Sequence, residues 1–373
     1  MKGERRPRVL MVDSERAWRG GQAQVRLLMK GLAQAGAEVA LAAPADGALF
    51  GRAADVERIA WDARPLSWWR LRRAISAGGY DVVHSHASRA HGAAALARLG
   101  ITPRPAHVVS RRVVDRPGRG AASLWKYRHG ADGYIAISSH VRAVLAGAGI
   151  PAARIALVRD GIDLEQFGGG GDAAALRAEF GIDGATRIVG SIAALTPEKA
   201  HADLLRAAAR VLAERGDVRF LIVGAGALGA SLQGLARELG IADRVIFAGF
   251  RDDAAHLLRV FDVFVLCPQR EGLGTSIMDA QAAGVPVVAT RAGGIPEIVV
   301  DGESGLLVAP GSPHDLAGAI LRMLGDGGLR ERCTRTALEQ SRGYDYHEMV
   351  YRTLDVYRRL CPTLPISPTK DAP

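Results

Sequence analysis

The sequence has no apolar run of the roughly 18 to 20 residues that a membrane-spanning helix requires. Its opening, MKGERRPRVLMVD, has basic residues and a short strand-like run, but lacks the apolar core and cleavage site of a signal peptide. Only three cysteines occur, Cys267, Cys333 and Cys361, without the spacing of a metal site or a disulfide framework. We therefore predict a cytoplasmic protein with free thiols.

Motifs for nucleic acid and for bound metal are missing as well. The sequence contains no zinc finger, RNA-binding aromatic motif or helix-turn-helix signature, so its net charge of +9 does not by itself indicate nucleic acid. Anionic lipid, phosphorylated small molecules or a plain excess of arginine are also compatible with that charge. No Asp-x-Asp triplet occurs, which argues against a diphosphate held by a metal ion. We predict no metal, no cofactor and no nucleic-acid partner.

The 373 residues do contain a repeated alternation of short apolar runs and helical patterns. The first run, 8–12, precedes a helical pattern in which Val25, Leu28, Met29 and Leu32 share one face. A second apolar run then completes a strand–helix–strand unit. Short apolar runs without polar alternation are typical of parallel strands that are covered on both faces.

This alternation predicts an α/β fold of two Rossmann-like, doubly wound parallel-sheet domains. The first domain is expected to cover 1–165 and the second 166–344, with the boundary in or just before the glycines at 168–171. A final helix at 345–360 is expected to pack back on the first domain. The proline-rich tail, 361–373, is predicted to be disordered.

The strongest candidate site is the string EGLGTSIMD at 271–279, between a predicted strand and a predicted helix. Gly272 and Gly274 let the backbone approach a ligand closely, and the amides at a helix N-terminus suit a phosphate. Glu271 can accept hydrogen bonds from sugar hydroxyls, and Asp279, one turn into the helix, can bind a ribose diol. The alternative is an ordinary strand-to-helix connection with an acidic residue that the helix dipole favours.

Other candidate residues are weaker on their own. Lys199, also between a strand and a helix, can neutralise a diphosphate or can be a solvated surface lysine. Gly20 and Gly21 open the first helix and can cradle a phosphate or form only a tight turn. His84 and His86 share one face of a strand end. A zinc site there would need a third ligand that the sequence does not identify, which leaves acceptor contact or packing.

The order of these motifs resembles that of family 4 glycosyltransferases of the group 1 type, which are retaining enzymes with the GT-B fold. The resemblance extends from the Gly-Gly loop to about residue 325. It is carried by VRDGIDLEQF, LTPEKAHADLL, FLIVGAGAL, VIFAGFRDD and REGLGTSIMDAQAAGVPVVATRAGGIPEIVVDGESGLLV. It implies an acceptor-binding first domain and a nucleotide-sugar-binding second domain that face a cleft.

The resemblance also implies a role for each matching position. The family's two glutamates, separated by seven residues, fall on Glu271 and Asp279, which would hold the donor sugar and the ribose. Lys199 would bind the diphosphate, and Phe250 and Arg251 would lie beside the base. The other implied donor contacts are glycines and backbone amides: Gly20, Gly21, Gly272, Leu273, Gly274 and Thr275.

The chain departs from the family pattern in three places. The second glutamate is Asp279, which is one methylene shorter. The arginine five residues before the lysine is Ala194, so a charge-assisted hydrogen bond worth roughly 1.5–3 kcal/mol is missing from the diphosphate. In place of a first-domain histidine, the chain reads Val109–Arg112, where Arg111 or Arg112 can supply positive charge; we select Arg112.

Together these features predict a metal-independent, retaining glycosyltransferase with Lys199, Glu271 and Arg112 as its catalytic residues. The predicted donor is a nucleotide sugar, with a UDP-sugar expected. The predicted acceptor is a glycan or lipid-linked molecule of cell-envelope polysaccharide or lipopolysaccharide synthesis. The alternatives are a catalytically silent GT-B protein that binds nucleotide or glycan, and another GT-B enzyme such as an epimerase or an inverting transferase.

The stretch PLSWWRLRR at 65–73 combines two tryptophans with three arginines. Such a mixture suits an anionic membrane surface, so peripheral association with the cytoplasmic face of the inner membrane is one interpretation. The other is a helix packed into the core that leaves a solvated basic face.

Overall fold

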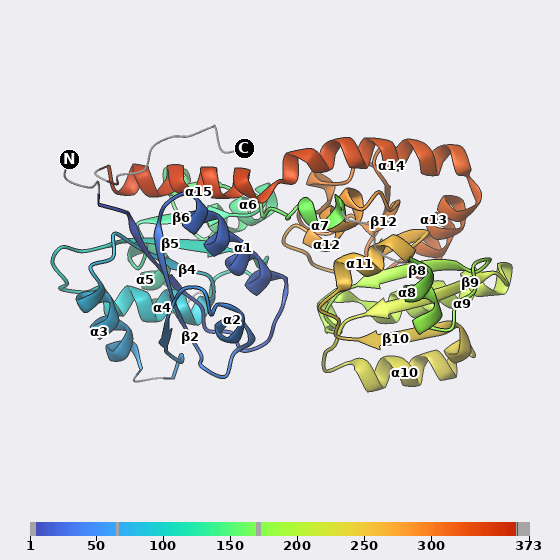
Figure 1. Ribbon diagram of the computed structural model, residues 1–373, viewed down its shortest axis with the longest axis horizontal. Helices are drawn as coiled ribbons and strands as arrows, with labels where there is room; N and C mark the ends of the chain where they lie inside the picture. Colours follow the sequence, from blue (N-terminus) through green and yellow to red (C-terminus); the bar gives the residue numbers. More distant parts are fainter. Residues whose placement is uncertain (1–4, 65–66, 119, 169–172, 363, 365–373) are drawn as a thin grey trace. The chain divides into compact units, whose positions relative to one another are not determined.

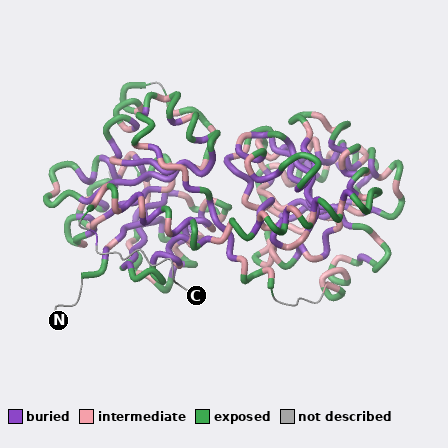
Figure 2. The backbone as a smooth tube through the Cα atoms, turned by 90° about the horizontal axis from the view of Figure 1, so that it is seen from above, coloured by how far each residue is buried: buried purple, intermediate pink, exposed green. Residues whose placement is uncertain are grey.

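The structure, a computed structural model, describes residues 5–64, 67–118, 120–168, 173–362 and 364. The chain divides into two compact units. The first consists of Met1–Gly161 and Tyr346–Pro373, and the second of Ile162–Asp345. Each is a parallel sheet covered by helices (Figure 1). Most residues of the strands are buried, and Figure 2 colours buried residues purple.

The first unit has a seven-stranded sheet in the order β3-β2-β1-β4-β5-β6-β7. Residues of β1 alternate between two cores: Val9 and Met11 join one, Leu10 and Val12 the other. Both faces are therefore buried, which explains the continuous apolar runs. The strands are β1 Arg8–Val12, β2 Glu38–Ala43, β3 Glu57–Ala60, β4 Val82–Ser85, β5 Ala106–Arg111, β6 Gly133–Ala136 and β7 Ile155–Leu157.

The chain returns to this unit in its last described helix, α15, which lies beside α1 (Figure 1). The two helices approach so closely that a Cβ atom on Gly31 would lie 2.3 Å from Cγ2 of Val350. The helices of this unit are α1 Gly20–Gln34, α2 Ala48–Arg52, α3 Trp68–Gly78, α4 Ser88–Ala97, α5 Ala121–His129, α6 Ser139–Gly147 and α15 Tyr346–Leu360. A short 3-10 turn, η1 Ala152–Arg154, precedes β7.

The predicted disordered tail needs a correction at its beginning. The backbone N–H of Cys361 still donates to the carbonyl of Tyr357, and Leu364 is buried in the core of the first unit. An apolar side chain that finds a core position is held there by the free energy of burial. The rest of the predicted tail, residue 363 and 365–373, lies outside the described residues.

The second unit has a six-stranded sheet in the order β10-β9-β8-β11-β12-β13. Its strands are β8 Arg187–Ile192, β9 Val218–Val223, β10 Val245–Gly249, β11 Val263–Leu266, β12 Val287–Thr290 and β13 Leu306–Val308. Its helices are α7 Glu165–Gly168, α8 Ala173–Glu179, α9 His201–Glu214, α10 Gly229–Glu238, α11 Ala254–Leu257, α12 Thr275–Ala282, α13 Pro313–Gly325 and α14 Gly327–Ser341. Single 3-10 turns are η2 Pro197–Lys199, η3 Ala242–Arg244, η4 Leu258–Val260, η5 Ile295–Glu297 and η6 Arg342–Tyr344.

The division between the units falls after Gly161, four residues before the expected boundary at 165. The side-chain amide of Gln24 holds Gly161 in the first unit: Nε2 donates to its carbonyl at 2.7 Å, and its N–H donates to Oε1 at 3.2 Å. The next residue, Ile162, donates to the carbonyl of Tyr344 in the second unit. Gly161 thus pairs with the first unit and Ile162 with the second. Because buried backbone groups need such partners, the boundary lies between these two residues. Of the glycines at 168–171, only Gly168 is described, at the end of α7.

Candidate functional site

The sheet order of the second unit locates a ligand site at its topological switch point. From β8 the chain builds outward through β9 and β10, then returns to the other side of β8 with β11. Open parallel sheets bind ligands where the loops after two such strands diverge. The loop after β8 carries Lys199, and the loop after β11 carries Glu271.

An ion pair joins these two loops. Nζ of Lys199 donates to Oε2 of Glu271 at 2.5 Å, and both side chains are largely buried, with 23% and 13% of their surface exposed. The other carboxylate oxygen of Glu271 accepts a hydrogen bond from the backbone N–H of Gly272 at 3.0 Å. The sequence-predicted residues Lys199 and Glu271 are therefore brought together, and the alternative of a solvated surface lysine is wrong.

The start of α12 adds unpaired backbone donors to this ion pair. Gly274 adopts a φ of 97° just before the helix, a conformation that glycine takes without strain. Among the described residues, none accepts a hydrogen bond from the N–H groups of Leu273, Gly274, Thr275 or Ser276. These amides and the positive end of the helix dipole suit an anionic ligand, as predicted for this string.

Gly293, which the sequence analysis did not single out, packs against the backbone of Glu271. A Cβ atom on Gly293 would lie 1.8 Å from the carbonyl oxygen of Glu271, and Gly293 has a φ of 53°. The N–H of Gly294 donates to the same carbonyl at 3.2 Å. The loop after β12 therefore fixes the backbone of the loop after β11. In the sequence, Gly293 is marked by the glycine pair in RAGGIPE. That pair predicts a turn but does not show which residue it contacts.

Two other glycines fit the loop after β8 to the loop after β9. A Cβ atom on Gly224 would lie 1.9 Å from the carbonyl oxygen of Ala193, and one on Gly226 would lie 2.3 Å from that of Leu195. The backbone N–H of Leu195 donates to Ala225 at 3.0 Å. These glycines position the chain that leads to Lys199. Ala194 lies in the same loop and offers no side-chain donor.

Asp279 lies one turn into α12, and no described residue donates a hydrogen bond to its carboxylate. Burial raises the pKa of Asp279 to about 7. Burial makes the ionised form of this carboxyl group unfavourable, and a hydrogen bond from a ligand hydroxyl would stabilise that form. The predicted contact between Asp279 and a ribose fits this environment and stays a prediction.

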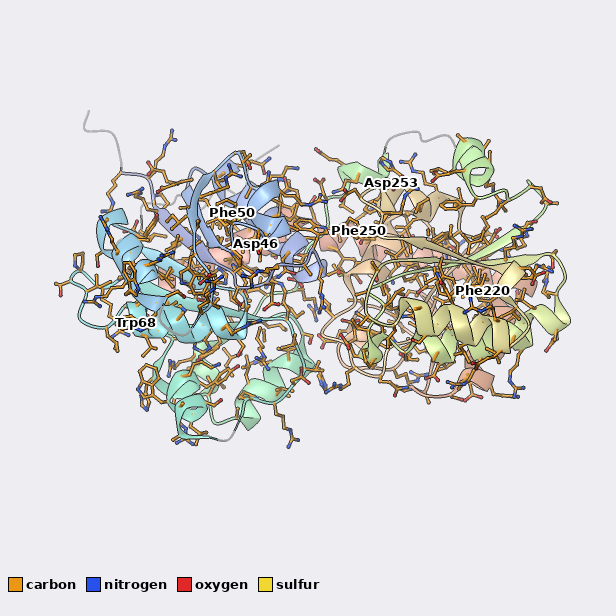
Figure 3. All side chains as sticks on the ribbon, turned by 90° about the horizontal axis from the view of Figure 1, so that it is seen from below. Asp46, Phe50, Trp68, Phe220, Phe250 and Asp253 are labelled. Carbon is orange, nitrogen blue, oxygen red and sulfur yellow. The ribbon has the colours of Figure 1, made fainter. Side chains whose placement is uncertain are left out.

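The predicted base contacts follow β10. Phe250 has 48% of its surface exposed, in contrast to the buried Phe220 of β9 (both are labelled in Figure 3). The guanidinium of Arg251 binds the carboxylates of Asp253 and Glu179. The exposed ring is available for stacking, whereas the guanidinium is already paired. The contact of either residue with a base stays a prediction.

The first unit has a switch point of its own, between β1 and β4. Asp13 follows β1 and is fully buried; its carboxylate accepts hydrogen bonds from the N–H of Glu15 at 2.7 Å and from Nε2 of Gln22 at 3.2 Å. Gly20 and Gly21 begin α1, and no described group accepts a hydrogen bond from their N–H groups. Their predicted contact with a diphosphate is compatible with these unpaired donors and stays a prediction.

Arg112 lies at the same edge of the sheet, just after β5. Its Nε donates to Asp160 at 3.0 Å, and its Nη1 lies 3.1 Å from Nδ1 of His86. Burial raises the pKa of Asp160, and the charge of Arg112 opposes that rise. Arg111 points elsewhere, to the hydroxyl of Tyr127. Of the two arginines proposed from sequence, only Arg112 contacts residues that follow other strands, and it is already paired.

His84 in β4 and His86 just after it contact other side chains in place of a metal ion. His84 is fully buried between the hydroxyl of Tyr357 at 2.6 Å and that of Ser110 at 2.8 Å. Burial lowers the pKa of His84 well below its usual value, so the ring is neutral. The packing interpretation is therefore correct for His84. His86 contacts Arg112 as described above.

In the part of the chain that the structure describes, no group of three or more His, Cys, Asp or Glu side chains could hold a metal ion. None of the described helices combines the length and apolarity that crossing a bilayer requires.

Comparison with known families agrees with this geometry. Residues 18–166 match the family described as Glycosyltransferase Family 4, and residues 172–340 match the one described as Glycosyl transferases group 1. The two units thus define a GT-B glycosyltransferase, which confirms the predicted fold class. The chain belongs to glycosyltransferase family 4.

Curated relatives bear the name D-inositol 3-phosphate glycosyltransferase. That of Acidothermus cellulolyticus is 33% identical over 306 residues, covering 75% of this chain and 67% of the relative. That of Mycobacteroides abscessus is 38% identical over 215 residues, covering 56% of this chain and 47% of the relative. The chain thus spans about half the length of the first curated relatives it matches.

A solved structure shares the fold over nearly the whole chain. The HepE protein of Anabaena, solved in complex with UDP and glucose, has a TM-score of 0.84 and 22% identity. The match covers 95% of this chain and 100% of that one.

Proposed function

We propose that the protein transfers a sugar from a nucleotide sugar, with UDP as the nucleotide, to a hydroxyl group of an acceptor. The observation that carries this proposal is the Lys199–Glu271 pair beside the unpaired amides of α12, at the switch point of the second unit. A diphosphate needs cationic and N–H donors together, and this edge supplies both. The HepE complex with UDP supports the choice of nucleotide.

In the proposed reaction the bond between the sugar's anomeric carbon and the diphosphate breaks, and a bond to the acceptor oxygen forms on the same face. Because the new bond forms on the face from which the diphosphate leaves, the configuration is retained. The acceptor's proton passes to the departing phosphate oxygen. Lys199 and the amides of Leu273, Gly274 and Thr275 stabilise the developing negative charge. Preorganised donors of this kind usually give the largest catalytic contribution. Glu271 would exchange its contact with Lys199 for the sugar hydroxyls, and no metal is required.

We further propose that the acceptor is a glycan or a lipid-linked molecule of the cell envelope. The surface of α3 supports a membrane-associated acceptor. Trp68 and Trp69 have 37% and 50% of their surface exposed, whereas Leu71 and Ile75 of the same helix are buried (Trp68 is labelled in Figure 3). The tryptophans are therefore not core residues. Exposed indole rings beside arginines suit the interface of an anionic membrane.

The transfer is tested by incubating the protein with UDP-sugars, an acceptor panel and EDTA, and by determining the anomeric configuration of the product by NMR. Release of UDP with retained configuration supports the proposal. Inversion would indicate an inverting transferase. UDP binding without turnover on any acceptor would favour the catalytically silent alternative, which the substitutions at Ala194 and Asp279 motivate.

A further inference from the structure

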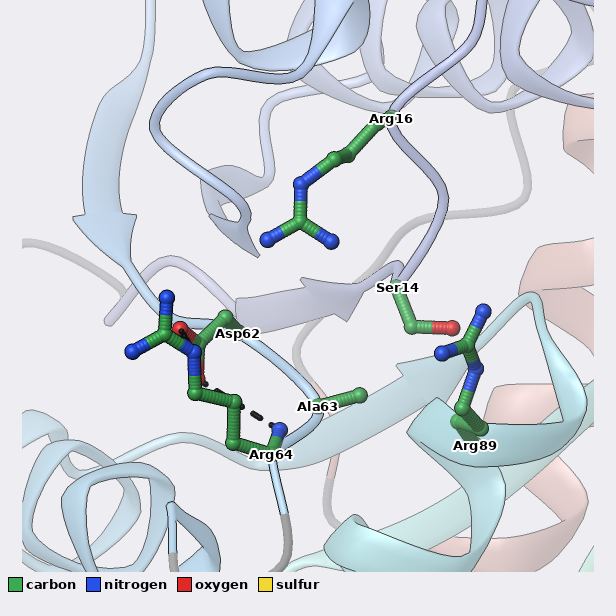
Figure 4. Close-up of a pocket in the computed structure, with 6 residues that line it drawn as sticks. All are labelled: Ser14, Arg16, Asp62, Ala63, Arg64 and Arg89. Carbon is green, nitrogen blue, oxygen red and sulfur yellow. Dashed lines mark hydrogen bonds and ion pairs between the residues drawn. The ribbon is translucent and has the colours of Figure 1, made fainter.

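A pocket of about 270 Å³ lies in the first unit, apart from the residues assigned so far (Figure 4). Three of the six residues that line it are arginines. The lining consists of Ser14, Arg16, Asp62, Ala63, Arg64 and Arg89. We call it the arginine pocket.

The arginine pocket lies at the carboxyl edge of the sheet. Ser14 and Arg16 follow β1, Asp62 and Arg64 follow β3, and Arg89 lies in the first turn of the helix after β4. Since β1 and β4 flank the switch point of this unit, the pocket is where an open parallel sheet binds its ligand. It therefore has the position of a substrate site, although no sequence motif identified it.

The arginines keep hydrogen-bond donors free for a ligand. Arg16 binds Asp46 through Nε at 2.9 Å, and Arg64 binds Asp62 through Nε at 2.9 Å. Neither uses Nη1 or Nη2 on any described acceptor. Among the described residues, the carboxylate nearest to Arg89 is that of Glu15, with an oxygen 3.9 Å from Nη2. The carboxylates thus orient the guanidinium groups and leave their outer nitrogens unpaired.

Hydrogen bonds hold the described backbone at Arg16 and at Arg64. The N–H of Ala48 donates to the carbonyl of Arg16 at 2.9 Å, and the hydroxyl of Ser67 donates to that of Arg64 at 2.9 Å. Arg89 is held by α4, whose N-terminus has no side-chain cap and no acidic residue in its first turn. Because these backbone positions are held before a ligand binds, ordering them adds no entropic cost to binding.

We propose that the arginine pocket binds a phosphate group carried by the acceptor. Guanidinium groups that approach from two loops and from the first turn of α4 match the several oxygens of one phosphate, and arginine binds phosphate best through bidentate contacts. A neutral sugar would offer the outer guanidinium nitrogens no charged acceptor, although Asp46 and Asp62 already pair with Nε of Arg16 and of Arg64. The assignment of this phosphate to the acceptor rests on the proposed glycosyl transfer. The phosphate can belong to a soluble polyol phosphate or to a lipid headgroup.

The test is calorimetric titration in the presence of saturating UDP, which occupies the proposed diphosphate site. The ligands are D-inositol 3-phosphate, unphosphorylated inositol and short-chain phosphatidic acid. We compare the wild type with Arg64→Gln/Arg89→Gln and with the control Arg142→Gln, an exposed arginine on α6 of the same unit. Each lost charge-assisted contact is expected to weaken binding about tenfold or more, so the double variant should bind about 100-fold less tightly.

Tighter binding of a phosphorylated ligand than of inositol, lost in the double variant and kept in the control, supports the proposal. Preference for the inositol phosphate or for the phosphatidic acid then identifies the source of the phosphate. The proposal is overturned if the wild type binds neither phosphorylated ligand, or if the double variant binds it as tightly as the wild type. A separate titration with UDP alone distinguishes the two proposals: failure to bind UDP contradicts the proposed transfer, whatever the arginine pocket binds.

Discussion

Nζ of Lys199 donates a hydrogen bond to Oε2 of Glu271 at 2.5 Å, joining the loop after β8 to the loop after β11. The two residues are 72 positions apart in the chain. Both side chains are largely buried and lie beside amides that have no acceptor among the described residues. A diphosphate would replace Glu271 as the partner of Lys199 and free the carboxylate for sugar hydroxyls.

Lys199→Ala should weaken the binding of UDP more than that of uridine, because only UDP presents a diphosphate. Loss of one charge-assisted hydrogen bond predicts a decrease in UDP affinity of roughly 10- to 100-fold. Titration of both ligands measures the difference. Arg187→Ala is the control, since Arg187 forms an ion pair with Asp262 at the opposite end of β8. An equal loss for uridine and UDP would mean that Lys199 does not contact the diphosphate.

Gly293→Ala should impair donor binding through the backbone of Glu271. The added Cβ atom would lie 1.8 Å from the carbonyl oxygen of Glu271, so the loop after β11 must move. Gly302→Ala is the matched control, because Gly302 also has a positive φ, of 78°, but has open space around its Cβ position. We expect lower affinity for a UDP-sugar in the first variant only. Equal affinities in the two variants would show that the contact with Glu271 is unimportant.

The fold could be predicted because burial on both sheet faces leaves continuous apolar runs. The exposed edge strand β3 has no such run, with three of its four residues, Glu57, Arg58 and Ala60, exposed. Another edge strand of the chain, β13, is apolar, but its three residues are too few for a periodic signal.

Lys199 and Glu271 could be predicted because they follow strands beside helix N-termini. The arginine pocket could not, because its residues come from two loops and a helix that are far apart in the sequence.

Asp279→Asn should change how stability depends on pH. Burial raises the pKa of Asp279 to about 7, so the folded protein keeps this proton over a range in which the unfolded chain, with a pKa near 3.8, has lost it. The contribution of Asp279 to stability therefore falls as pH rises from about 4 to about 7. We therefore expect the free energy of unfolding of the variant, minus that of the wild type, to be larger at pH 8 than at pH 5. Denaturant unfolding at both pH values measures this, and a difference independent of pH would contradict it.

Arg112→Ala should destabilise the first unit, because it leaves the buried carboxylate of Asp160 without its partner. Breaking a buried pair in this way costs about 3–5 kcal/mol. Arg112→Ala/Asp160→Asn should recover most of that loss in a denaturant titration. The double variant also tests catalysis when it is compared with Asp160→Asn alone. Equal donor turnover in these two proteins would remove Arg112 from the catalytic residues.

The most direct test of the central claim is a thermal shift measurement in EDTA with UDP, other nucleoside diphosphates and their sugars. At 100 times its dissociation constant a ligand adds about 2.7 kcal/mol of stability, which corresponds to a shift of a few degrees for domains of this size. We predict such a shift with UDP and UDP-sugars, and its loss in Lys199→Ala. No shift with any nucleotide, or an equal shift in Lys199→Ala, would contradict a metal-independent diphosphate site at Lys199 and Glu271.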